Sequence, residues 1–331
     1  MLQPRAHRAA PTRRVWVALS IVYVVWGSTY LAIQYAVKTL PPFLMAGVRF
    51  VVAGAVLFIW DRWTASRSGV QSSTSARRDR GRGWLGALLI GGLLLLGGNG
   101  GVVWGEAHHV PSGISALIFA TLPMWMAVLS FVLYRERLGA AVLGGLVLGF
   151  AGTALLVQGA SGGRAGLVGP LVILGGAVCW SLGSVLSRWA PLPERQMRST
   201  AMQMLCGGAL LTAAGLIAGE ADRTDLGRVS TSSWIAFAYL IVMGSLVGFT
   251  AYTWLLSNAR LPLISTYAYV NPVVALFLGW ALASEELTVR TFTASAIVIA
   301  AVVIIVTARA RAGRTVPDRP ETPDLIPTER P

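Results

Sequence analysis

Apolar segments of roughly twenty residues recur along the whole chain and are separated only by short polar breaks. A helix of about 20 residues is about 30 Å long, which matches the hydrocarbon core of a bilayer. The segments are continuously apolar and too long for barrel strands, which alternate in polarity, so they predict membrane-spanning helices. We expect ten spans, at residues 15–36, 43–60, 84–105, 111–133, 138–158, 167–187, 199–218, 234–256, 263–283 and 289–308.

The second half of the chain repeats the pattern of the first. The first span of each half aligns at a shift of 154 residues, which pairs Trp26 with Trp180. Further along, the shift becomes 149 and pairs Pro123 with Pro272. Five spans in each half is an odd number, so the second copy enters the membrane from the opposite side. The sequence therefore predicts an all-α polytopic membrane protein built as two inverted five-helix repeats.

Composition and charge support a membrane protein and exclude nucleic acid as a partner. Hydrophobic residues make up 55% of the chain and charged residues 12%, with a mean hydropathy of +0.65, whereas soluble domains have roughly 25% charged residues. The net charge of +13 follows the positive-inside rule, because 21 of the 27 Arg and Lys residues lie in the two termini and in loops on one side. Both termini are therefore expected in the cytoplasm.

These features suggest four parts. We expect a cytoplasmic N-terminal segment at 1–14, a first repeat at 15–158 that includes a basic cytoplasmic loop at 61–83, a second repeat at 167–308, and a disordered cytoplasmic tail at 309–331. The loop is rich in Ser and Arg and the tail in Pro, so neither can bury a core. Cys179 and Cys206 both lie in predicted spans, and the chain implies no disulfide, metal or cofactor.

Arg49 is the charged residue that lies well inside a predicted span. An isolated cation there costs roughly 2.5–3.5 kcal/mol on insertion scales, so Arg49 needs a partner or a water-filled cavity. Glu106 lies at a compatible depth, and the two residues are a candidate charge pair or gate. The alternative is that Arg49 contacts a substrate carboxylate, which suits its asymmetry, because Gln203 holds the matching position in the second repeat.

Aromatic and polar side chains gather near the centres of several spans. Lipid offers such groups no hydrogen-bond partners. Tight helix packing could satisfy them, but their presence on the first helix of each repeat and on the ninth helix favours a shared central cavity. The candidate substrate-binding residues are Trp26, Ser28, Thr29, Tyr30, Arg49, Asn99, Trp180, Ser184, Tyr252, Tyr267, Tyr269 and Asn271.

Pro123 and Pro272 occupy equivalent places in the fourth and ninth spans. Each removes a backbone N–H and should kink its helix, so the pair is a candidate hinge, although prolines are also simply tolerated in membrane helices. Catalytic motifs give little support for an enzyme: the sequence has no HExxH and no P-loop, and GISA (113–116) lacks the final glycine of GxSxG. The chain is therefore not expected to be an enzyme, and an ion or substrate gradient would drive any concentrative transport.

Several motifs in order resemble the drug/metabolite transporter superfamily. They are WGSTY (26–30), PPFLMAGVRF (41–50), Gly98 with Asn99, Glu106, VPSG (110–113) and STYAYVNPVVA (265–275). The chain is most similar to the EamA branch, particularly its YedA-like bacterial exporters. That resemblance covers residues 15 to 307 and implies two EamA repeats, a bacterial inner-membrane location and efflux of small metabolites, amino acids or drug-like compounds.

The resemblance also points to ligand contacts at Trp26, Ser28, Tyr30, Arg49, Tyr267, Tyr269 and Asn271. The chain lacks the first-helix carboxylate of the small multidrug transporters, so proton antiport by that route is not expected. The leading interpretation is a secondary exporter working by alternating access, with a small-molecule substrate, the lipid bilayer and a candidate coupling ion as partners. The alternatives are a lipid or lipid-precursor flippase and a membrane sensor or scaffold that transports nothing.

Overall fold

The computed structural model describes residues 12–67, 76–135, 138–160, 166–187, 189–259, 263 and 266–312, and every regular element within these ranges is helical. In chain order, the first five spans are α1 (Thr12–Ala36), α2 (Pro42–Arg67), α3 (Ala76–Gly91) with η1 (Gly92–Asn99) and α4 (Gly100–Ala107), α5 (Ser112–Phe119) with α6 (Leu122–Tyr134), and α7 (Ala140–Ala160). The second five are α8 (Val168–Leu186), α9 (Gln196–Ile217), α10 (Thr231–Tyr239) with η3 (Leu240–Val247) and α11 (Gly248–Asn258), α13 (Tyr267–Ala283), and α14 (Val289–Ala312), and a short 3₁₀ turn, η2 (Leu226–Arg228), precedes α10.

The ten predicted spans are confirmed in the described part of the chain. Nine helices there are long and apolar enough to cross a membrane, and a shorter apolar helix at Tyr267–Ala283 forms the ninth span. The segment predicted as the loop 61–83 is partly helical: α2 continues into it as far as Arg67, and α3 begins at Ala76. Residues 68–75 lie outside the described ranges. The segments 1–11 and 313–331, which contain most of the expected cytoplasmic terminal segments, also lie outside them.

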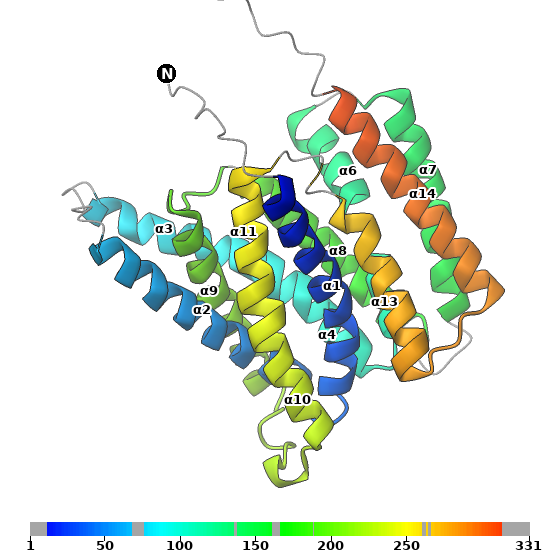
Figure 1. Ribbon diagram of the computed structural model, residues 1–331. Helices are drawn as coiled ribbons and strands as arrows, with labels where there is room; N and C mark the ends of the chain where they lie inside the picture. The colour runs from blue at the N-terminus through cyan, green and yellow to red at the C-terminus, as the bar shows by residue number, and fades with distance from the viewer. Residues whose placement is uncertain are drawn as a thin grey trace, which may run out of the picture.

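The two repeats pack with the two-fold relation that inverted repeats require. α2 packs on α9, and α7 packs on α14, so that each of these helices meets its counterpart in the other repeat. α1 packs on α13 and α11 of the second repeat, and α8 correspondingly packs on α6, η1 and α4 of the first. In Figure 1, α7 and α14 form a pair at one side, while α1, α11 and α13 run together through the middle. Each of these helix contacts therefore joins the first repeat to the second.

Glycines allow the helices to approach closely at these contacts. A Cβ atom added at Gly176 of α8 would lie 2.9 Å from the carbonyl oxygen of Gly98 and 3.1 Å from that of Gly97. On the α7–α14 pair, a Cβ atom at Gly145 would lie 2.7 Å from a side-chain carbon of Ile305. Small residues let backbones approach in this way in membrane bundles, where packing contacts rather than water exclusion hold helices together.

Three spans are irregular near their middle. The third and eighth spans, which are equivalent in the two repeats, each contain an eight-residue π-helical stretch, η1 and η3. The fourth span breaks at residues 120–121, and Pro123 occupies the first turn of the helix that follows. The ninth span instead continues through Pro272. π-Helical segments occur frequently at functional sites, and the side chains around these interruptions define the cavity described next.

Candidate functional site

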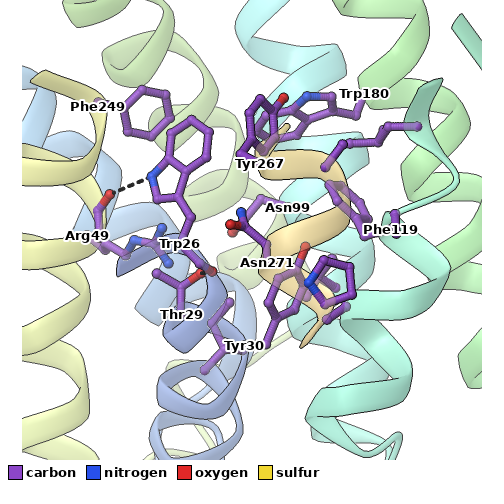
Figure 2. Close-up of a pocket in the computed structure, with 18 of the residues that line it drawn as sticks. Trp26, Thr29, Tyr30, Arg49, Asn99, Phe119, Trp180, Phe249, Tyr267 and Asn271 are labelled. Carbon is purple, nitrogen blue, oxygen red and sulfur yellow. Dashed lines mark hydrogen bonds between the residues drawn. The ribbon is translucent and has the colours of Figure 1, made fainter. Parts of the chain in front are cut away.

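A central cavity lies among helices of both repeats. It has a volume of about 100 Å³, several times the roughly 10–15 Å³ that one water needs. Figure 2 shows aromatic rings around its edge, with Asn99 and Asn271 near its middle. The lining residues are Trp26, Thr29, Tyr30, Ile33, Arg49, Phe50, Asn99, Val102, Ala116, Phe119, Ala120, Leu122, Trp180, Gly244, Phe249, Tyr267, Ala268, Asn271 and Pro272.

Two tryptophans at equivalent positions in the repeats line the cavity. Trp26 of α1 packs on Phe249, with ring centroids 5.3 Å apart, and on Tyr267, at 5.5 Å. Trp180 of α8 packs edge-on against Phe119, at 5.6 Å. Rings at these spacings and tilted geometries attract one another beyond the burial of their surfaces. The pairing of the two tryptophans was visible in the sequence, and the structure places both beside the same cavity.

Arg49 of α2 enters the cavity wall as a buried cation, with a relative exposure of 4%. Its Nε donates a hydrogen bond of 2.9 Å to Ser245 Oγ in η3, while its Nη1 is buried without a hydrogen-bond partner in the described residues. The expected ion pair with Glu106 is not formed: the ion pairs between described residues do not include it, and both Glu106 oxygens are buried without a partner. Arg49 therefore keeps donor capacity for another group.

Amide and carbonyl oxygens complete the polar part of the site. The Oδ1 atoms of Asn99 and Asn271 are buried and accept no hydrogen bond from the described residues. The carbonyl of Ala268 lacks its usual helical donor, because the residue four positions later is Pro272, which has no N–H. Phe119 is in the same relation to Pro123 in the first repeat. Both Phe119 and Ala268 line the cavity, which thus combines one cation with several acceptors.

Most of the predicted binding residues meet at this cavity, but four do not line it. Ser28 Oγ hydrogen-bonds the Tyr239 hydroxyl at 2.6 Å, and Ser184 Oγ donates to the carbonyl of Trp180 at 2.8 Å. Tyr252 packs on Trp26, with ring centroids 5.0 Å apart, and Tyr269 packs against a cluster of Ala120 with Val298 and Val302 of α14. The hydroxyls of Ser28 and Ser184 thus find their hydrogen-bond partners on a neighbouring helix and on the same helix, as tight helix packing predicts.

The residues that sequence reasoning missed are nearly all apolar. They are Ile33, Phe50, Val102, Ala116, Phe119, Ala120, Leu122, Gly244, Phe249 and Ala268. Apolar residues on membrane helices carry no chemical signal, but helical spacing could have found some of them. Ile33, for example, follows Thr29 by four residues and therefore shares its helix face.

The arrangement is suited to binding rather than to catalysis. The cavity presents a guanidinium donor, amide groups and aromatic faces, which are the few directional groups and apolar walls typical of small-molecule sites. Among the described residues there is no group of three or more His, Cys, Asp or Glu side chains that could hold a metal ion. The cysteines, Cys179 and Cys206, are free.

Comparisons with known proteins identify the family of the chain. Residues 14–158 and 167–307 each match the EamA-like transporter family. The uncharacterized inner membrane transporter YedA of Escherichia coli K12 is 37% identical over 291 residues, which cover 87% of this chain and 89% of that protein. The uncharacterized transporter YvbV of Bacillus subtilis is 23% identical over 89% of this chain and 92% of its own length.

A solved crystal structure supports the fold alone. It is 20% identical in sequence and superposes with a TM-score of 0.57 over 91% of this chain and 99% of the other chain. The family match occurs twice, spans most of the sequence and coincides with the two helical repeats. The chain is therefore a multi-pass membrane transporter, not an enzyme, and belongs to the EamA-like transporter family.

Proposed function

We propose that this transporter is a secondary exporter that moves small molecules bearing an anionic group through the central cavity by alternating access. The observation that carries the proposal is the buried guanidinium of Arg49, which keeps Nη1 unpaired at the wall of a cavity shared by both repeats. A buried cation without a counter-charge is costly, and a substrate carboxylate would supply that charge. The aromatic faces of Trp26 and Trp180 would hold the rest of the molecule.

We also propose an orientation of the protein in the membrane. With both termini in the cytoplasm, the excess of Arg and Lys falls on the inner side, as the positive-inside rule requires. YedA is described as an inner membrane transporter, and the same membrane is proposed for this chain. The cavity of about 100 Å³ is smaller than typical ligand pockets of roughly 300–1,000 Å³. Most substrates would therefore have to enter a wider conformation, which alternating access provides.

The test is transport into inside-out membrane vesicles of a defined panel of radiolabelled amino acids and carboxylic acids. Arg49→Ala should reduce uptake of an anionic or zwitterionic panel member at least about tenfold, the effect of losing roughly 1.4 kcal/mol or more of binding. Arg290→Ala is the matched control, because Arg290 is an exposed arginine on α14 away from the cavity.

Normal uptake by an Arg49→Ala protein that inserts at the wild-type level would remove the role proposed for the guanidinium. Movement of a labelled lipid headgroup in liposomes, without uptake of the soluble panel, would instead favour the flippase interpretation.

A further inference from the structure

Glu106 is a buried acid that the binding site does not use. It lies in the last turn of α4 with a relative exposure of 4%, and neither carboxylate oxygen has a hydrogen-bond partner in the described residues. Val102, one helical turn earlier, lines the cavity. Residues four apart share a face of a helix, so Glu106 lies one turn beyond the cavity, toward the end of the bundle where α5 begins.

The helices packed around α4 provide no cation paired with this carboxylate. On α2, Arg49 donates its Nε to Ser245 instead. On α8, the residues from Val168 to Leu186 include no charged side chain, and its ionisable group, Cys179, lies beside Gly97 of η1. η1 itself, Gly92–Asn99, has no ionisable residue.

The remaining neighbours are a phenol, a hydroxyl and two imidazoles, and none of them pairs with the Glu106 carboxylate. On α1, the phenol of Tyr30 lies near Glu106 and supplies no positive charge. On α5, Ser115 lies close to the carboxylate, but its hydroxyl donates to the carbonyl of Pro111 at 3.2 Å. The imidazole of His108, two residues along the chain, bonds the carbonyl of Trp104 through Nδ1 at 2.7 Å, and that of the following residue, His109, is exposed.

Glu285, the second acid in this region, is placed quite differently. Its Oε1 accepts hydrogen bonds from the backbone N–H of Ser112 at 2.7 Å and from that residue's hydroxyl at 2.8 Å, and its Oε2 accepts one from the N–H of Gly113 at 3.1 Å. These donors at the first turn of α5 stabilise an ionised carboxylate. The negative charge of Glu285 is close enough to oppose a second one on Glu106.

Burial, missing donors and a neighbouring negative charge all favour the neutral carboxylic acid at Glu106. A charge removed from water without a partner is strongly disfavoured, so such a group takes up a proton instead. Buried acids of this kind inside membrane spans commonly act as proton relays. The equivalent end of the second repeat, α11 (Gly248–Asn258), has no acidic residue, so the acid occurs on one side of the pseudo-symmetric bundle.

We propose that Glu106 is the proton-binding site through which this transporter is coupled to a proton gradient. The inference rests on the proposed transport function. In the arrangement described here, in which the carboxyl group is buried, one Oε of Glu106 holds a proton. When the helices around α4 separate, water reaches the carboxyl group, the O–H bond breaks and the proton passes to water, and the carboxylate is later reprotonated from water. Substrate and proton thus occupy neighbouring levels of the same passage.

The first experiment observes the proton directly and needs no substrate. Infrared difference spectra of the full-length protein in liposomes, recorded while the bulk pH is changed, report the carbonyl stretch of protonated carboxylic acids. The wild-type protein should show such a band near neutral pH, and the band should disappear as the pH rises. Glu106→Gln should abolish it, whereas Glu286→Gln, which changes an exposed acid next to Glu285, should retain it. Persistence of the band in Glu106→Gln, or its absence from the wild type, would overturn the proposal.

The second experiment separates coupling from transport. Uptake of the radiolabelled amino-acid and carboxylic-acid panel into inside-out vesicles is measured with and without an imposed pH gradient. The gradient should stimulate wild-type uptake, and Glu106→Gln should lose that stimulation while still equilibrating the panel downhill. Stimulation by a sodium gradient in place of the pH gradient, or unchanged stimulation in the variant, contradicts the assignment. If no panel member moves in any vesicle, the transport proposal fails, while the infrared measurement still decides whether Glu106 binds the proton.

Discussion

Arg49 and Ser245 show how a charged side chain is accommodated inside this bundle. Both side chains are buried, and the Nε to Oγ hydrogen bond of 2.9 Å joins α2 to the π-helical stretch η3. Depth along the helices correctly suggested that Arg49 needs a polar partner. Depth says nothing about rotation around the helix axis, however, and that rotation directs Arg49 toward η3 and away from Glu106.

We expect Ser245→Ala to destabilise the protein by about 1.5–3 kcal/mol, because it leaves a donor of a buried cation without its acceptor. The measurement is the thermal unfolding midpoint in detergent, arranged as a double-mutant cycle with Arg49→Ala. In the Arg49→Ala background, the same change at Ser245 should cost little, since its partner is already gone. Equal costs in the two backgrounds would show that the hydrogen bond does not stabilise the fold.

At the level of helices, the irregular segments coincide with the cavity. Asn99 ends η1, Gly244 lies within η3, and Ala120 lies at the break between α5 and α6, and all three line the cavity. The Nε1 of Trp26 also donates to the carbonyl of Gly244 at 3.3 Å. Irregular helices expose backbone groups that regular helices keep occupied, and membrane proteins tolerate this where the groups face a cavity.

The close approach of α8 to the third span depends on glycine. We expect Gly176→Ala to lower the thermal unfolding midpoint by several degrees, because its Cβ would meet the backbone carbonyls of Gly97 and Gly98, and overpacking costs about 1–3 kcal/mol.

Gly175→Ala is the matched control, since a Cβ there has nothing within 4 Å. Alanine is the better helix former by roughly 0.5–1 kcal/mol, so this variant should be as stable as the wild type or slightly more stable. A similar loss in both variants would contradict the packing explanation.

The sequence predicted most span boundaries to within a few residues, but not the extension of α2 and α3 into the basic loop, and not the interruptions. Apolar runs end where charges and prolines begin, which is why the first span was expected at 15–36 and is observed as Thr12–Ala36. The π-helical form of η1 and η3 depends on contacts between spans, which no local pattern encodes. Pro123 did signal an interruption of the fourth span, whereas the equivalent Pro272 lies within a continuous helix.

At the scale of the whole molecule, the inverted repeat could be predicted because it rests on counting spans and on the alignment of Trp26 with Trp180. The exact cavity could not, because half of its wall is apolar side chains brought together by helices from both repeats. Cross-helix hydrogen bonds also gather at the end where α5 begins. There Tyr35 donates to the carbonyl of Leu282 at 2.7 Å, and Glu220 accepts from the N–H of Leu44 at 2.9 Å. Each of these bonds joins a residue of the first repeat to a residue of the second.

The proposed orientation can be checked by labelling intact cells with a membrane-impermeant maleimide, in a background with Cys179 and Cys206 replaced by serine. Ser161→Cys, in the loop after the fifth span, should be labelled because an odd number of crossings separates it from a cytoplasmic N-terminus. Ser73→Cys, after two crossings, should react only once the cells are permeabilised. The opposite pattern would reverse the direction assigned to the transporter.

The two repeats share one fold, but Arg49 and Glu106 are present only in the first repeat. A carrier assembled from two identical chains would present two copies of every side chain about its axis, and a central guanidinium would then face a second one. Joining the copies in one polypeptide removes this restriction, and Gln203 stands where the second cation would be. In the proposed transport cycle, the cavity would therefore carry a cation on the α2 side only, and a bound anion would have one preferred orientation.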